Sequence, residues 1–304
     1  MVDAITPQEN YRARTVKRER RSNARIEQLD QQILEVLEAD HPQSVRHVFY
    51  RMTDPRLAES VEKSERGYRH VQDRIVKLRR AGRLSYGWIT DATRRGYHTP
   101  TYRDRAEFLR SVKSHYRADL WQDAGCYCEV WTESRSIAGV IEKDCCELAV
   151  SLYPAGGFSS ITLAYQAAEA INWYAKDGRV VVIYYIGDFD PAGVLIDVTL
   201  ERELRQHLVS GVDLVFERVG ITEDQIEAFD LPKKPRKETD RRAPHVQATV
   251  EAEAMPAHLL RGMLRQRIED LLPDRALAVA KVEEESAQAY FEKWASVMQG
   301  SATS

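Results

Sequence analysis

The longest run of strongly apolar residues in the chain is Val180–Ile186, which carries no charge. Such a run predicts a strand buried on both faces, as in a parallel sheet that helices cover. The run ends at Gly187, and Asp188 and Asp190 follow it. Side chains two residues apart on an extended chain point the same way. The pattern therefore predicts paired carboxylates at the carboxyl end of a central strand, where open α/β sheets bind ligands.

The chain before this strand has the pattern of an α/β unit. Its segments predict a strand, a helix, a short strand or turn, and a second helix: residues 126–133, 134–152, 154–160 and 162–174. The order indicates a right-handed parallel unit whose strand ends meet at one edge of the sheet. Glu133, at the end of the first strand, is therefore expected beside Asp188 and Asp190.

The α/β pattern continues after the two aspartates. It predicts a helix, a strand, a capping-box helix and a last helix: residues 195–208, 213–220, 222–229 and 276–298. Residues 231–244 form a basic, proline-rich loop that either follows DNA or only connects. Glu251 and Glu253 are either extra acids near the site or surface charges, and the second interpretation is favoured because exposed glutamates are common.

Three amphipathic segments, residues 26–37, 43–52 and 67–80, precede the α/β pattern and predict helices. Residues 84–89 are expected to form a short wing or strand, which completes the order of a winged-helix domain. The third helix carries basic residues outside its apolar stripe, as suits the major groove of double-stranded DNA: Arg69, Arg74, Lys77, Arg79 and Arg80. A solvated basic helix is the alternative.

The charge distribution supports a polyanionic partner for the first part of the chain. Residues 1–120 hold 25 Lys and Arg against 17 Asp and Glu, a net charge of +8, whereas the whole chain has −3. The predicted domains are a basic arm, a winged-helix domain, a connecting segment, an α/β domain with C-terminal helices, and a disordered tail: residues 1–24, 25–98, 99–124, 125–298 and 299–304.

The candidate chemistry is that of a hard metal ion. Asp188 and Asp190 repel each other, and carboxylates without thiolate or imidazole suit Mg²⁺ or Mn²⁺. Alternatively, Asp190 only caps the helix that Pro191 begins, since the Asp-x-Asp pattern often occurs by chance. The four cysteines lack common zinc spacing, which favours reduced thiols.

Three separate elements together resemble a Toprim domain, found in topoisomerases, bacterial primases and several nucleases: Glu133 after its strand, the turn at 157–160, and the segment Gly187-Asp-Phe-Asp-Pro-Ala-Gly193. The last is most similar to the A subunit of topoisomerase VI. The resemblance implies that Glu133, Asp188 and Asp190 hold Mg²⁺ next to a scissile phosphate. Many of these relatives carry a lysine directly after the glutamate, where this chain has Ser134, so the charge near the metal ligands is expected to differ.

Residues 43–52 resemble the nucleophile motif of topoisomerase VI A subunits and of the meiotic double-strand-break transesterases. The motif places Arg46 four residues before Tyr50, so the two share a helix face. The resemblance implies that Tyr50 attacks a DNA phosphodiester while Arg46 holds the phosphate. The alternative is a structural Tyr50, since its neighbours Val48, Phe49 and Met52 are apolar.

The resemblance covers about residues 25–95 and 125–272. It implies an α/β Toprim domain behind a winged helix, a Mg²⁺-dependent transesterase that leaves a 5′-phosphotyrosyl link, a homodimer, and a separate ATPase subunit for any strand passage. A hydrolytic Toprim nuclease and a non-catalytic DNA-binding protein are the alternatives. The sequence has no apolar run of membrane-spanning length and no signal-peptide pattern, so we expect a cytoplasmic protein.

Overall fold

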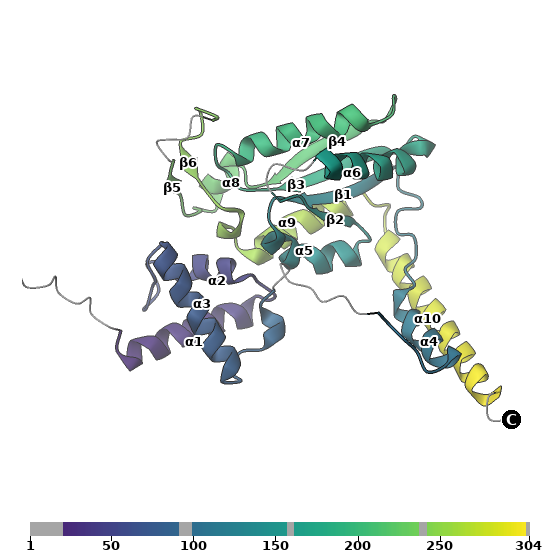
Figure 1. Cartoon of the computed structure of the whole chain (residues 1–304), viewed down its shortest axis with the longest axis horizontal. Coiled ribbons are helices and arrows are strands. Elements are labelled where there is room, and N and C mark those ends of the chain that lie inside the picture. The colour runs from purple at the N-terminus through teal and green to yellow at the C-terminus, as the bar shows by residue number, and fades with distance from the viewer. Residues whose placement is uncertain (1–20, 91–98, 157–160, 237–241, 302–304) are drawn as a thin grey trace, which may run out of the picture.

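A four-stranded parallel sheet forms the centre of the protein (Figure 1). The computed structural model describes residues 21–90, 99–156, 161–236 and 242–301. The strands, in the order β2-β1-β3-β4 across the sheet, are β1 (Cys126–Thr132), β2 (Ser151–Pro154), β3 (Val180–Ile186) and β4 (Leu214–Gly220). The predicted central strand is confirmed, with β1 and β4 as its neighbours.

Helices cover both faces of the sheet (Figure 1). One face carries α6 (Ile161–Tyr174) and α7 (Gly193–His207), and the other carries α5 (Arg135–Glu147) and α9 (Ala257–Glu269). Successive side chains of β3 enter the two layers in turn: Val181, Ile183 and Tyr185 pack with α6 and α7, and Val182, Tyr184 and Ile186 pack with the opposite layer. This alternation explains why β3 is apolar at every position.

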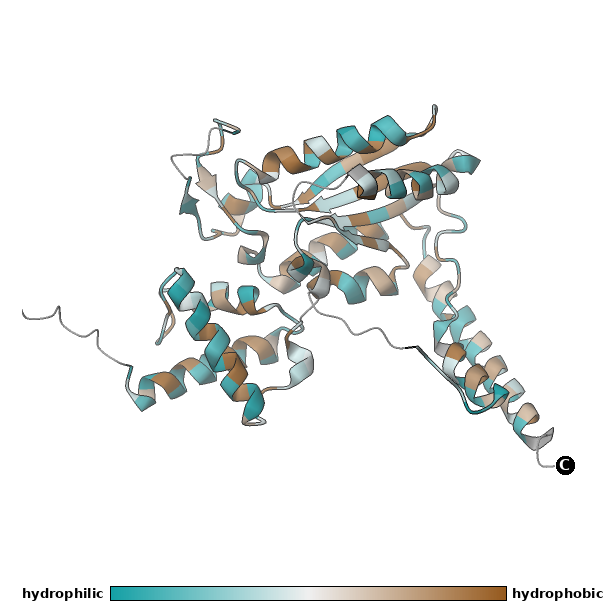
Figure 2. Cartoon of the chain, in the orientation of Figure 1, coloured by the Kyte–Doolittle hydropathy of each residue, from teal (hydrophilic) through white to brown (hydrophobic). Residues whose placement is uncertain are grey.

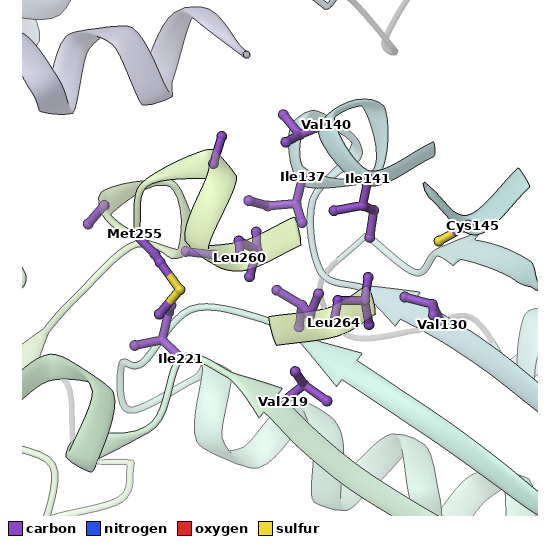
Figure 3. Close-up of a cluster of buried hydrophobic side chains, with 14 of the residues drawn as sticks. Val130, Ile137, Val140, Ile141, Cys145, Val219, Ile221, Met255, Leu260 and Leu264 are labelled. Atoms are coloured by element: carbon purple, nitrogen blue, oxygen red, sulfur yellow. The ribbon is translucent and has the colours of Figure 1, made fainter. Parts of the chain in front are cut away.

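The layer of α5 and α9 is a continuous apolar core. Figure 3 shows Ile137 and Ile141 of α5 facing Leu260 and Leu264 of α9, with Val130 of β1 beside Leu264. All five side chains are at most 1% exposed. The same core continues into the N-terminal helices, so the two parts of the chain are packed together.

The predicted helix over 134–152 is too long. Helix α5 ends at Glu147, and Ala149 adopts the left-handed conformation with φ 53°, which a helix cannot continue. Residues Ser151–Pro154 then form β2 beside β1. Farther along, the capping box at Thr222 and Gln225 is confirmed as the start of α8 (Glu223–Ala228). Two short strands follow, β5 (Lys234–Pro235) and β6 (Ala248–Thr249).

Three helices form the N-terminal part: α1 (Asn23–Ala39), α2 (Val45–Met52) and α3 (Glu65–Arg80). A serine side chain caps the start of each, which satisfies a backbone N–H that the helix leaves unpaired. The segment predicted as a wing or strand instead forms a short 3₁₀ helix, Tyr86–Trp88. Ile89 then makes a single parallel bridge with Gln43. The backbone of this segment is thus used to close the three-helix unit.

The connecting segment contains α4 (Arg105–Val112), followed by the 3₁₀ turn Lys113–His115, and it pairs with α10 (Ala276–Ser301). Arg110 and Lys113 both form ion pairs with Glu292 of α10. These two helices form an arm that extends away from the sheet (Figure 1). The last helix therefore packs on the connecting segment and runs past position 299, where the tail was expected to begin.

Four expectations fall wholly or partly outside the described residues. They are the basic arm, the turn at 157–160, the basic loop at 231–244 and the end of the tail. No helix among the described residues is long and apolar enough to cross a membrane.

Candidate functional site

Glu133 and Asp188 meet at the carboxyl end of the sheet, as the strand order predicts. The Glu133 N–H donates to Ile186 O at 2.8 Å, which continues the ladder between β1 and β3 by one residue. The Asp188 N–H donates to the Glu133 carboxylate at 2.9 Å. The Asp188 carboxylate in turn accepts from the N–H of Ala252 at 2.8 Å.

These two carboxylates are short of positive charge. Burial raises the pKa of Asp188 to about 8, and the negative charges of Glu133 and Glu253 add to the effect. Burial also raises the pKa of Glu133, with a further contribution from Asp190. Each acid accepts a hydrogen bond from a backbone N–H, which lowers its pKa by less than burial raises it. The pair is therefore an electrostatically strained site that favours a proton or a cation.

A third acid, Glu253, completes this acidic cluster. It lies in the 3₁₀ turn Ala252–Ala254, is 5% exposed, and accepts hydrogen bonds from the hydroxyls of Ser136 and Ser134. The interpretation of Glu251 and Glu253 as surface charges is wrong. A two-residue antiparallel bridge, in which Phe189 and Val250 exchange both backbone hydrogen bonds at 2.9 Å, brings this distant segment onto the strand end.

Asp190 has a different environment from Asp188. Its Oδ1 accepts from the N–H groups of Ala192 and Gly193, at 2.8 and 2.6 Å, where α7 begins. One of its oxygens thus serves the helix start, as the capping alternative predicts. The negative charge of Asp190 still acts on Glu133, so the three acids of the motif share one neighbourhood.

The fit of a divalent cation is partial. Within the described residues, no three His, Cys, Asp or Glu side chains are grouped as a metal site. Glu133 and Asp188 offer the oxygen ligands and the excess negative charge that suit Mg²⁺ or Mn²⁺. A third ligand would have to come from Asp190 or Glu253, each of which already uses one oxygen in hydrogen bonds. The cysteines form no disulfide, and three of the four are buried.

Ser134, which directly follows Glu133 where a lysine is common in the proteins that the motif resembles, has a structural role in this chain. Its hydroxyl accepts from the N–H of Ile137 and so caps α5. A lysine could not accept this hydrogen bond.

The 187–193 loop is held by close backbone contacts that the sequence does not show. A Cβ on Gly193 would lie 2.2 Å from the backbone oxygen of Asp188, and a Cβ on Gly187 would lie 2.9 Å from the Glu133 carboxylate. Arg218 donates to the backbone oxygens of Gly187, Asp188 and Gly193 and pairs with Asp197 at 2.6 Å. The loop geometry therefore depends on two glycines and one arginine from β4.

A second cluster lies around Glu251 on the side of α2. Arg46 donates to one oxygen of Glu251 and Lys234 to the other, each at 2.5 Å. Burial alone would raise the pKa of Glu251, but the two cations outweigh it and lower that pKa. This carboxylate is ionised and neutralised, in contrast to Asp188.

Tyr50 lies inside this second cluster. It is 3% exposed, and its ring packs on Phe49 at 5.3 Å between centroids. Burial and the charge of Glu251 raise the pKa of Tyr50 well above its ordinary value. The ammonium groups of Lys63 and Lys234 lie 5.6 and 5.8 Å from the centre of its ring. Arg46 and Tyr50 thus share a helix face as predicted, and the burial of the tyrosine also agrees with the alternative of a structural role.

Sequence reasoning missed Lys63 and Lys234. Lys63 donates to the backbone oxygens of Pro232 and Lys233, and burial, followed by the charge of Lys234, lowers its pKa to about 8. Lys234 belongs to the basic loop that either follows DNA or only connects. The alternation of basic and proline residues there was the available signal, but only the tertiary contact with Glu251 singles out this lysine.

The basic residues of α3 divide into two groups. Arg74 forms a two-pronged ion pair with buried Asp30 of α1, at 2.6 and 2.5 Å, and Arg79 donates to the backbone oxygens of Tyr86 and Ile89. These two arginines therefore stabilise the three-helix unit. The other three are exposed: Arg69, Lys77 and Arg80. Arg69 forms an ion pair with Glu65.

No family model, curated protein or solved structure matches the chain. The class that the geometry itself defines is a parallel α/β protein with an acidic cluster at its strand ends. The Toprim and winged-helix assignments stay predictions from the motifs.

Proposed function

We propose that this protein cleaves a phosphodiester of double-stranded DNA with help from Mg²⁺ or Mn²⁺, in the manner of a topoisomerase VI A subunit. One observation carries the proposal. The segment 251–253 contacts both clusters, because Glu251 accepts from Arg46, one helix turn before Tyr50, and the N–H of Ala252 donates to the Asp188 carboxylate, so the candidate nucleophile and the acidic cluster belong to one neighbourhood.

The residues of the second cluster suit the first half of a transesterification. Arg46, Lys63 and Lys234 supply positive charge for a phosphate next to Tyr50. The tyrosine hydroxyl would attack phosphorus while its proton passes to the neighbouring Glu251 carboxylate. A phosphotyrosyl bond forms at the 5′ end, the bond from phosphorus to the 3′ oxygen breaks, and that oxygen takes a proton from water.

The acidic cluster suits the stabilisation of that reaction. A divalent cation bound by Glu133 and Asp188 would neutralise charge on the phosphate oxygens. Because the pKa of Asp188 is about 8, protons compete with the cation at neutral pH. Cation affinity is therefore expected to rise with pH as Asp188 loses its proton and to level off above about pH 8.

A hydrolytic nuclease is the second candidate. The observation that favours it is the state of Tyr50, whose side chain is 3% exposed and whose pKa is raised by burial. A buried, protonated phenol is a poor nucleophile. In this alternative a water replaces the tyrosine, and both products are free DNA ends.

The test is a cleavage reaction with labelled supercoiled and linear DNA and with Mg²⁺ or Mn²⁺. Tyr50→Phe and Asp188→Asn are compared with Tyr68→Phe, a nearby tyrosine that packs on Phe49. The proposal expects a protein–DNA adduct that resists denaturant, is lost in the first two variants and is kept in the third. Cleavage without an adduct that survives in Tyr50→Phe would establish the hydrolytic nuclease. DNA binding without metal-dependent cleavage would leave a non-catalytic DNA-binding protein.

A further inference from the structure

The arm exposes an apolar stripe on a face of α10 other than the one that packs on the α4 segment. The inner face includes buried Ala280 and Ala295. The stripe consists of side chains that are 50–68% exposed: Val279, Val282, Tyr290, Trp294 and Val297. Their spacing follows the helical period, so they line one side of the helix. Figure 2 shows apolar and polar positions mixed along the whole arm.

This stripe matches itself when the helix is reversed about position 288. Val279 and Val297 lie nine residues before and after that position, and Ser286 and Tyr290 lie two residues before and after it. Val282 and Glu283 lie before the centre, and Trp294 and Lys293 lie at the matching positions after it. In an antiparallel pair, Val282 would therefore lie beside Trp294 of the second copy, and Glu283 would lie beside its Lys293.

We propose that two copies of this chain associate through α10, packed antiparallel about a two-fold axis at the level of position 288. The same patch on both copies forms the interface, as two-fold symmetry requires. The charges set the direction of packing. A parallel pair would place Glu283 beside Glu283 and Lys293 beside Lys293, whereas the antiparallel pair brings Glu283 into the same layer as Lys293 of the partner.

The position of the arm allows this association without blocking the candidate site. The arm points away from the sheet and from α2 (Figure 1). The stripe from Val279 to Val297 spans about 27 Å of helix at about 1.5 Å per residue. An interface of that length is small, so we expect a dimer that dissociates on the order of micromolar concentration.

Charge reversal tests the direction of packing. The association constant of the full chain is measured by sedimentation velocity over a concentration series for wild type, Glu283→Lys, Lys293→Glu and the double variant. The proposal expects each single reversal to weaken the dimer about tenfold and the double variant to recover it. Tyr116→Phe is the control for Glu283, because the Tyr116 hydroxyl donates to Glu283 at 2.7 Å. Single reversals without effect would overturn the antiparallel arrangement.

Apolar substitutions test the location of the interface. Val282→Glu and Trp294→Ala are expected to weaken association at least 100-fold. Val198→Glu and Trp173→Ala, which alter side chains 59% and 65% exposed outside the arm, are expected to leave it unchanged. Thermal unfolding confirms that each variant folds. A chain that is monomeric at all concentrations, or a dimer that survives Val282→Glu, would overturn the proposal.

Discussion

Glu251 and Glu253 lie two residues apart but belong to opposite electrostatic environments. Glu251 is neutralised by Arg46 and Lys234, which lower its pKa. Glu253 is buried against two serine hydroxyls and adds its charge to that of Glu133 and Asp188. The charge of Glu251 is balanced within the protein, whereas the cluster of Glu133, Asp188 and Glu253 lacks positive charge. This difference agrees with the proposed function, in which a cation binds at Asp188 and the additional positive charge of Lys63 favours an anionic substrate near Tyr50.

The largest expected effect concerns the strained acid. The folded-state pKa of Asp188 is raised from 3.8 to about 8, so the folded protein binds more protons than the unfolded chain between those values. The stability from this group is fully present below about pH 4 and is lost as the pH rises to 8. The free energy of unfolding should fall by up to about 5 kcal/mol over that range.

Chemical denaturation at several pH values measures this slope. Asp188→Asn, which mimics the protonated acid, should remove most of it, while Asp213→Asn at an exposed position should not. If the free energy of unfolding of Asp188→Asn fell with pH as steeply as that of the wild type, a group other than Asp188 would cause the pH dependence. Mg²⁺ should raise the melting temperature of the wild type at pH 8 but not that of Asp188→Asn.

The next effect concerns the loop that presents the acid. Gly193→Ala forces a methyl group to within 2.2 Å of the Asp188 backbone oxygen unless the loop moves. We expect a loss of about 2–3 kcal/mol, measured as the free energy of unfolding. Gly262→Ala in α9 is the matched control, because its Cβ meets nothing within 4 Å and alanine favours a helix. Equal destabilisation by both changes would argue against a tight loop.

The same substitution at the two glutamates should act in opposite directions. Glu251→Gln removes the partner of Arg46 and Lys234 and should destabilise the protein by about 1 kcal/mol. Glu253→Gln removes a charge that repels Asp188 and should lower the pKa of Asp188 and flatten the pH slope. Unfolding of both variants at pH 6 and 8 makes the comparison. If the two variants changed the free energy of unfolding in the same direction and with the same pH dependence, the two clusters would not differ in their electrostatics.

The smallest expected effect concerns DNA affinity. If α3 contacts DNA, Lys77→Ala should reduce the salt dependence of binding by about one phosphate contact. Arg79→Ala should instead act on the fold, since Arg79 bonds to backbone oxygens of the segment after α3. Fluorescence anisotropy across a salt series and thermal unfolding separate the two outcomes. A salt dependence unchanged in Lys77→Ala would place the DNA-binding surface elsewhere.

Local patterns determined much of this protein. The apolar run of β3, the capping box at Thr222 and the periodic stripes of α1 and α3 each depend on neighbours in the chain, so their signals lie within a few residues. The strand order also predicted that Glu133 and Asp188 would meet, because parallel strands end at the same edge of a sheet.

Only the tertiary structure decided the electrostatics of the site. Glu253, Lys63 and Lys234 reach it from distant segments, and nothing near them in the sequence indicates which charge each one faces. The same is true of Arg74, which the sequence predicted as a DNA contact and which the structure pairs with Asp30. Burial and charge pairing are set by the folded arrangement of distant residues. The sequence by itself therefore determined most of the elements and the principal acids, whereas the short strand β2, the 3₁₀ turn at Tyr86–Trp88 and the environment of each charge followed from the packing.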